Sequence, residues 1–143
     1  MRPWRFVDGL RPRIGKIYVS KAQIVSIVDD DASVRAAMES LVKSQGLVAF
    51  VFESAEDFLR SPRVDDSACL VTDVQMPGMS GLDLQDRLIT QGSRIPMIFI
   101  TAFPEQTIRS RAEAGGALAF LEKPFGGRAM IELVRQALAA EPR

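Results

Sequence analysis

Polar side chains that could carry out phosphoryl chemistry follow four separate apolar stretches of the sequence. They are Asp29 with Asp30, then Asp73, Thr101 and Lys123. The carboxyl ends of parallel strands share one ligand-binding edge, so we expect these side chains to converge. Close carboxylates repel one another, and Mg²⁺ relieves that repulsion by binding one or two of them together with water and phosphate oxygens. The set suits phosphoryl transfer to Asp73 beside Mg²⁺, with Lys123 as a point charge on the product phosphate.

The stretch CLVTDVQMPGMSG, residues 69–81, holds the central aspartate of this set. Cys69 to Thr72 form a short apolar and β-branched run that predicts a buried strand, and the following Pro and Gly residues predict a loop. Asp73 alone could equally cap that loop or the next helix. Thr101 offers a hydroxyl that could reach a phosphoryl oxygen only once that group is present, which makes it a candidate switch.

Five apolar runs predict strands, and helical spacing of apolar residues appears between them. The strands are expected at 24–28, 47–52, 69–72, 97–101 and 117–121. Helices are expected over 34–42, from Ser54 through 59 with Asp57 completing a capping box, over 82–89, from about 104 to 114, and over 131–138. The alternation predicts an α/β fold, a flavodoxin-like doubly wound sheet of five parallel strands in the order 2-1-3-4-5, with helices on both faces.

The composition excludes several classes of function. The chain has 143 residues, 47% apolar and 25% charged, with 18 basic and 18 acidic residues. These values are typical of one globular domain, and no apolar run is long enough to span a bilayer. The absence of histidine removes Ser-His and Cys-His pairs and histidine-ligated metals. The single cysteine, Cys69, cannot form an internal disulfide, and we expect a cytoplasmic location.

The first 21 residues differ from the rest. They carry six Lys or Arg against one acid, and Pro and Gly interrupt any regular period. A basic arm could contact nucleic acid, an acidic partner or an anionic membrane, but we favour a poorly ordered extension with no specific role. The expected organisation is therefore an extension over 1–21 and one domain over 22–140, with no output domain.

The chain from Gln23 to about Ala140 resembles the receiver domain of two-component response regulators. The resemblance rests on the motifs IVSIVDDD, LVTDVQMPGMSG, IFITA and FLEKPF, which occur in this order. It implies a single-domain receiver in which Asp73 is the phosphoacceptor. It also implies that Mg²⁺ is bound by Asp29, Asp30, Asp73 and the Gln75 carbonyl, and that Lys123 precedes a cis peptide bond to Pro124.

The same resemblance implies that Thr101 and Phe120 are switch residues. Phe120 taken alone could be ordinary strand packing. Three features depart from the family pattern: Pro104 at the start of a helix, Gly126-Gly127 in place of a capping residue, and Phe120 in place of a tyrosine. None of them touches the five chemical positions.

The function expected from this resemblance is a bacterial phosphorylation-operated switch, not an enzyme beyond its own phosphorylation and slow dephosphorylation. A histidine kinase or phosphotransfer protein would supply the phosphoryl group. The fourth helix and fifth strand of the fold would contact a downstream protein or a second copy, and we expect no membrane or nucleic-acid partner. Two alternatives remain: a haloacid-dehalogenase-type phosphatase using Asp29 and Asp31, and a receiver-like binding module that is not phosphorylated.

Overall fold

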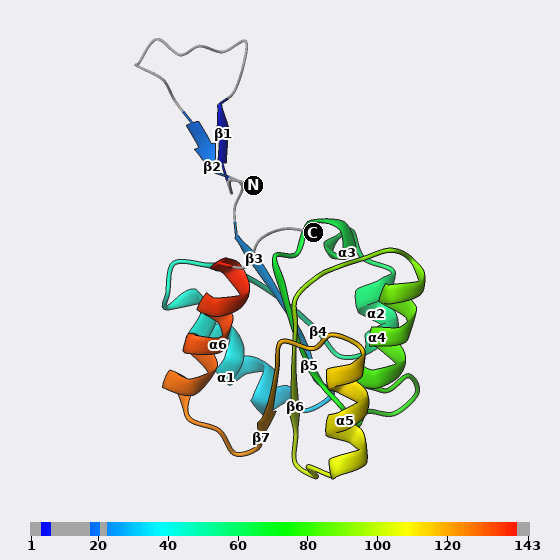
Figure 1. Ribbon diagram of the computed structural model, residues 1–143. Coiled ribbons are helices and arrows are strands. Elements are labelled where there is room, and N and C mark those ends of the chain that lie inside the picture. The colour runs from blue at the N-terminus through cyan, green and yellow to red at the C-terminus, as the bar shows by residue number, and fades with distance from the viewer. Residues whose placement is uncertain (1–3, 7–17, 21–22, 140–143) are drawn as a thin grey trace.

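The computed structural model describes residues 4–6, 18–20 and 23–139. Five parallel strands form the central sheet in the order β4-β3-β5-β6-β7 (Figure 1). They are β3 (Ile24–Val28), β4 (Val48–Phe52), β5 (Cys69–Asp73), β6 (Met97–Thr101) and β7 (Ala119–Glu122). Numbered among themselves, the strands follow the predicted order 2-1-3-4-5, which is confirmed. Every residue of β3, β5 and β6 is buried, as expected for strands covered on both faces.

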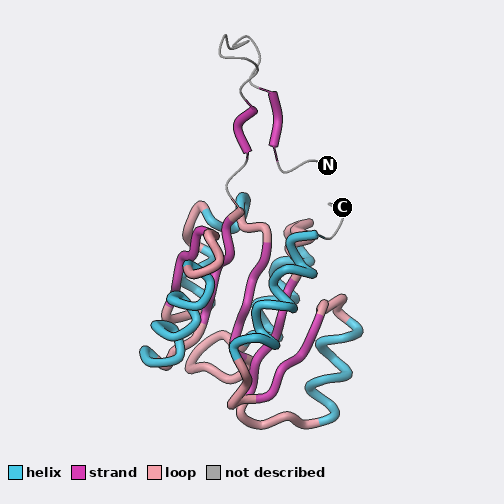
Figure 2. Tube along the Cα trace, turned by 90° about the vertical axis from the view of Figure 1, so that its left-hand side faces the viewer, coloured by secondary structure: helices cyan, strands magenta, loops and turns pink. Residues whose placement is uncertain are grey.

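Helices cover both faces of the sheet, and Figure 2 shows the resulting layers from the side. They are α1 (Ala32–Lys43), α2 (Ala55–Leu59), α3 (Arg63–Asp66), α4 (Gly81–Thr90), α5 (Gln106–Ala114) and α6 (Gly127–Ala139). On one face, Met38 of α1 and Met130 of α6 pack against Ile27 and Val71. On the other, Phe58 of α2 and Leu84 of α4 pack with Phe99. Two apolar cores therefore hold the sheet edge that carries the polar residues.

Several boundaries differ from the predicted ones. The helix α3 was not predicted, because four residues are too short to show a period. Ser54 does cap α2, accepting a hydrogen bond from the Asp57 N–H at 3.1 Å. The reciprocal capping box, however, belongs to α4, where Ser80 and Asp83 exchange side-chain to backbone bonds.

Two short strands, β1 (Trp4–Phe6) and β2 (Tyr18–Ser20), pair antiparallel in the basic segment. No strand was predicted there, since strands of three residues are too short to produce a detectable alternation. The rest of the segment, 1–3, 7–17 and 21–22, and residues 140–143 lie outside the described ranges. Within those ranges, no helix is long and apolar enough to cross a membrane.

Candidate functional site

The carboxyl ends of the strands bring the predicted chemical positions to one edge. Asp29 follows β3 directly, and its N–H bonds the Phe52 carbonyl at the end of the neighbouring strand β4. Asp73 and Thr101 are the last residues of β5 and β6. Lys123 follows β7, with its N–H 2.7 Å from the Thr101 carbonyl. The parallel ladder itself therefore sets the spacing of these residues.

Three carboxylates lie together at this edge. One oxygen each of Asp29, Asp30 and Asp73 falls within 4.8 Å of the others. Asp29 is fully buried, Asp73 is 6% exposed, and Asp30 is open to solvent. Two desolvated carboxylates with a third at the mouth of the site form an oxygen donor set suited to a hard divalent cation.

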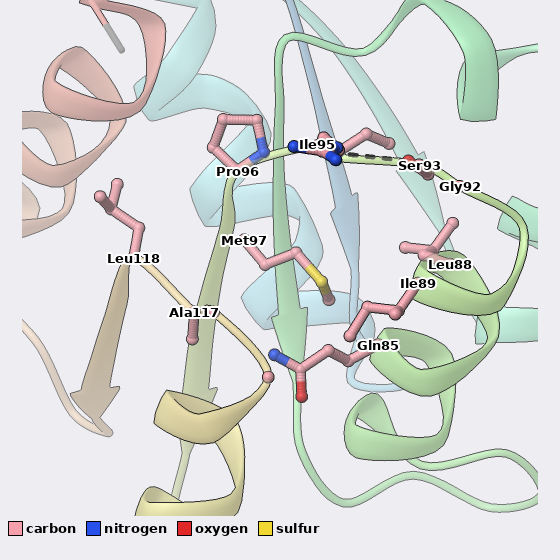
Figure 3. A pocket seen from close by; sticks show the side chains of 13 residues that line it. Gln85, Leu88, Ile89, Gly92, Ser93, Ile95, Pro96, Met97, Ala117 and Leu118 are labelled. Atoms are coloured by element: carbon pink, nitrogen blue, oxygen red, sulfur yellow. Dashed lines mark hydrogen bonds between the residues drawn. The ribbon is translucent and has the colours of Figure 1, made fainter. Parts of the chain in front are cut away.

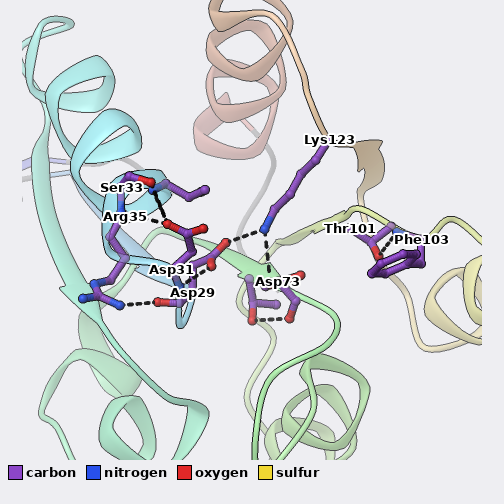
Figure 4. Close-up of polar contacts among 10 residues, drawn as sticks. Asp29, Asp31, Ser33, Arg35, Asp73, Thr101, Phe103 and Lys123 are labelled. Atoms are coloured by element: carbon purple, nitrogen blue, oxygen red, sulfur yellow. Dashed lines mark hydrogen bonds and ion pairs between the residues drawn. The ribbon is translucent and has the colours of Figure 1, made fainter.

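Lys123 reaches across the sheet edge to two of these carboxylates (Figure 4). Its Nζ lies 3.0 Å from Asp29 Oδ2 and 3.3 Å from Asp73 Oδ2. The peptide bond from Lys123 to Pro124 is cis, as the family resemblance implied. The lysine therefore links the ends of β3, β5 and β7 through charge-assisted hydrogen bonds.

The surroundings of Asp73 disfavour its charged form. Burial, and next the neighbouring charge of Asp29, raise the pKa of Asp73 above its ordinary value of 3.8, although Lys123 and the Gln75 backbone N–H act in the opposite direction. Burial alone would lower the pKa of Lys123, but its bonds to Asp29 and Asp73 outweigh that effect and raise it. The lysine is therefore held as a cation, while burial and Asp29 still disfavour the charged form of Asp73.

In the described part of the chain, neither candidate switch residue forms a hydrogen bond with the carboxylates. Thr101 is fully buried, and its Oγ1 accepts a hydrogen bond from the Phe103 N–H at 3.0 Å. In Figure 4 this pair stands apart from Asp73. Phe120 is half-buried against the core that contains Phe99, and the Arg109 guanidinium lies 4.9 Å from its ring centroid.

Residues 74–80 form the loop that leads from Asp73 to α4. Gln75 is exposed, and its backbone N–H acts to lower the pKa of Asp73. The Gly81 N–H donates to the Val74 carbonyl at 2.8 Å and closes the base of the loop. A Cβ on Gly81 would overlap the Asp73 backbone oxygen. Only glycine therefore permits α4 to start this close to the end of β5.

Sequence reasoning missed the contacts that three residues make around the site. Asp31 caps α1, with its side chain accepting from the Ser33 and Val34 N–H groups, and its place just before a helical period was a usable signal. Arg35 donates to the Asp29 carbonyl at 2.7 Å. Glu56 of α2 accepts from the Met79 N–H at 3.0 Å. For these last two contacts the sequence carries no local signal.

The role of Asp31 as a helix cap bears on the phosphatase alternative. That reading needs Asp29 and Asp31 to act as one acidic pair, but the cluster of three carboxylates contains Asp30 and not Asp31. The arrangement therefore leaves that alternative without its second carboxylate and without a role for Asp73.

A pocket of ≈ 680 Å³ lies at the opposite edge of the sheet, where β6 and β7 begin (Figure 3). Its walls are the ends of α4 and α5 and the segments before the two strands, including Gln85, Ile89, Met97 and Leu118. Gln85 is 2% exposed, and its Nε2 donates to the Ala112 carbonyl of α5 at 3.1 Å. The pocket is separate from the carboxylates, and Gln85 joins α4 to α5 beside it.

Comparison with known proteins gives one consistent result. The family described as "Response regulator receiver domain" matches residues 25–135. Nodulation protein W of Bradyrhizobium diazoefficiens is 41% identical over 120 residues, covering 84% of this chain and 53% of that protein. The transcriptional regulatory protein FixJ of Azorhizobium caulinodans is 40% identical over 114 residues, covering 80% and 54%. The chain thus spans about half the length of these curated relatives.

Solved structures agree with the sequence matches. The crystal structure of FixJ-N has a TM-score of 0.76 and 34% identity, covering 85% of this chain and 97% of that one. The response regulator StyR has a TM-score of 0.77 and 40% identity, covering 82% and 59%.

Proposed function

Because the chain belongs to the response regulator receiver domain family of two-component signalling, we propose that it accepts a phosphoryl group on Asp73 with Mg²⁺ bound beside it. The observation that carries the proposal is the grouping of Asp29, Asp30 and Asp73, with Lys123 bonded to the first and the third. Phosphorylation would change the surface that the chain presents to other proteins.

The residues at the strand ends fit a divalent cation. The pKa of Asp73 is raised by burial and by Asp29, which is the unfavourable pairing that a bound cation relieves. Asp29, Asp30, Asp73 and the Gln75 carbonyl would hold Mg²⁺. When bound, the ion neutralises charge on the transferring phosphoryl oxygens.

The chain's own residues supply the acceptor and its orientation. A carboxylate oxygen of Asp73 attacks phosphorus, so a P–O bond forms while the P–N bond of a phosphohistidine donor breaks and its electrons remain on the imidazole nitrogen. Lys123 already lies 3.3 Å from Asp73 Oδ2 and would hold the product phosphate as a point charge. We propose no turnover of other substrates beyond slow loss of this phosphoryl group.

The switch would begin at Thr101. Its buried hydroxyl could donate to a phosphoryl oxygen on Asp73 only after that group arrives, drawing the end of β6 toward β5. Phe120 and the surface of α5 and β7, the fourth helix and fifth strand of the receiver fold, would follow this movement. A histidine kinase or phosphotransfer protein upstream, a downstream protein and a phosphorylation-dependent homodimer are the partners we propose, in the cytoplasm.

Acetyl phosphate provides the direct test. With Mg²⁺, the wild-type chain should gain one phosphoryl group by intact-mass measurement, and EDTA should prevent it. Asp73→Asn should abolish labelling, whereas Asp65→Asn, an exposed aspartate of α3, should leave it unchanged. Undiminished labelling of Asp73→Asn would contradict the assignment. Phosphotransfer profiling against the host's histidine kinases would then identify the donor.

A further inference from the structure

The loop over residues 74–80 is held at two points by different elements. Its base is closed by the bond from the Gly81 N–H to the Val74 carbonyl at 2.8 Å. Its far end is held from α2, where Glu56 Oε2 accepts the Met79 N–H at 3.0 Å. This second contact joins residues 23 positions apart, so it ties the loop to α2, which lies outside the carboxylate cluster found among the described residues.

The glycine before Met79 makes this contact feasible. Gly78 has a φ of +78°, a left-handed conformation that costs other residues free energy. A Cβ at Gly78 would also lie 2.8 Å from Glu56 Oε2, closer than ordinary van der Waals contact. Both the backbone turn and the close approach of Glu56 therefore require a glycine, which has no Cβ, at position 78.

The carboxylate of Glu56 is directed to the backbone. Among the described residues, the ion pairs formed by acidic side chains do not include Glu56, and neither does the carboxylate cluster. A hydrogen bond from a backbone N–H to a charged, partly buried carboxylate is stronger than one between neutral groups. It therefore restrains the loop more firmly than a turn alone would.

We propose that Glu56 is a positioning residue for the metal and phosphoryl site, an inference that rests on the proposed function. The loop it restrains carries Gln75, which lies two residues after Asp73. The backbone N–H of Gln75 acts to lower the pKa of Asp73, and the carbonyl of Gln75 is the expected backbone ligand. Releasing Met79 frees the loop at its far end, so the backbone of Gln75 is no longer fixed relative to Asp73. Glu56 acts through the loop and does not touch the metal.

Two substitutions separate the hydrogen bond from the charge. Glu56→Asp keeps the charge but is one methylene too short to reach Met79. Glu56→Gln loses the charge but keeps an oxygen acceptor at the same reach. We expect Glu56→Asp to weaken Mg²⁺ binding about tenfold by titration calorimetry, the scale of outer partners of metal ligands, and Glu56→Gln to weaken it less than about threefold.

Amide hydrogen exchange of Met79 in metal-free protein gives a readout that does not depend on phosphorylation. Exchange should be faster in Glu56→Asp and close to wild type in Glu56→Gln. Glu53→Asp is the matched control, since Glu53 is exposed just before α2, and it should change neither quantity.

The outcomes distinguish this inference from the proposed function. Wild-type Mg²⁺ affinity in Glu56→Asp, or a larger loss in Glu56→Gln than in Glu56→Asp, overturns the positioning role. Failure of the wild-type chain to bind Mg²⁺ overturns the proposed function instead. If Glu56→Asp does not fold, the test uses Glu56→Gln alone. Rapid exchange of the Met79 amide in the folded Glu56→Gln protein, together with unchanged Mg²⁺ affinity, then overturns the inference.

Discussion

The hydroxyl oxygen of Thr101 accepts a hydrogen bond from the backbone N–H of Phe103 at 3.0 Å. This bond ties the buried end of β6 to the loop that leads into α5. In the described part of the chain this hydroxyl acts only as an acceptor, so its proton is still available for a phosphoryl oxygen. One side chain thus connects the acceptor strand with the segment that precedes the proposed output helix.

Replacing Thr101 tests that connection. We expect Thr101→Val to lower the free energy of unfolding by about 1 kcal/mol, since the Phe103 N–H loses its acceptor. Asp73 should still be phosphorylated, but phosphorylation should change the NMR chemical shifts of the α5 amides less than it does in the wild type. Thr101→Ser keeps the hydroxyl and should retain the response. If the α5 amide shifts of Thr101→Val change as fully on phosphorylation as those of the wild type, the hydroxyl is not part of the switch.

The raised pKa of Asp73 predicts a pH-dependent effect of Asp73→Asn. A carboxyl whose pKa is raised on folding stabilises the fold when protonated and loses that contribution as pH rises through the folded pKa. In EDTA, Asp73→Asn should therefore be more stable than wild type at neutral pH. The difference should vanish as pH falls through the raised pKa of Asp73.

Thermal denaturation from pH 7 down to pH 3 measures this difference. Saturating Mg²⁺ should reverse its sign, because only the wild type keeps all three carboxylates. An asparagine variant that is less stable than wild type in EDTA at every pH would contradict the prediction.

Removing Lys123 should have opposite effects on the metal-free fold and on cation binding. Lys123→Met leaves two carboxylates uncompensated, and we expect a loss of about 3 kcal/mol. The same change removes a competing positive charge, so Mg²⁺ should bind several-fold more tightly. The raised pKa of Lys123 means that its stabilisation is complete below the ordinary value of 10.5 and disappears as pH rises through the raised pKa.

Lys43→Met is the control for Lys123, since Lys43 forms an exposed pair with Glu39 and should change stability by less than about 1 kcal/mol. Urea denaturation and calorimetric Mg²⁺ titration of both variants provide the measurements. Weaker Mg²⁺ binding by Lys123→Met would show that the lysine orders the carboxylates more than it competes with the ion.

Gln85 should stabilise α5 from the neighbouring helix. Gln85→Leu removes the bond to the Ala112 carbonyl, which still accepts from the Ala117 N–H at 3.0 Å. Because the acceptor keeps a partner, we expect a loss of only about 1 kcal/mol, together with faster hydrogen exchange in α5. Gln106→Leu, on the exposed start of α5, should change neither. Unchanged exchange in Gln85→Leu would contradict this role.

Much of the fold could be predicted because its signals are local. The apolar runs before Asp29 and Asp73 are long enough to identify buried strands, and the turn residues after them mark the loops. The parallel arrangement then determines which strand ends meet. The helix α3 and the strands β1 and β2 could not be predicted, since each is shorter than the period that would reveal it.

The site was predictable only as a set of residue types at one sheet edge. Which carboxylate Lys123 approaches more closely depends on side-chain packing, and it is Asp29 rather than the proposed acceptor Asp73. The contact of Glu56 with Met79 depends on the relative placement of α2 and a loop 23 residues away. Contacts between a side chain and a distant backbone group leave no pattern in the sequence.

The bond from Gln85 to the Ala112 carbonyl attaches α5 to α4 near the C-terminal end of α5. Arg111 adds a second attachment there, to Asp86 of α4 at 2.6 Å. At the other end, the Glu105 cap makes no side-chain hydrogen bond. A helix of nine residues is about 13 Å long at a rise of 1.5 Å per residue. A small tilt about the Gln85 attachment is therefore amplified at the end nearest Thr101, where the proposed signal originates.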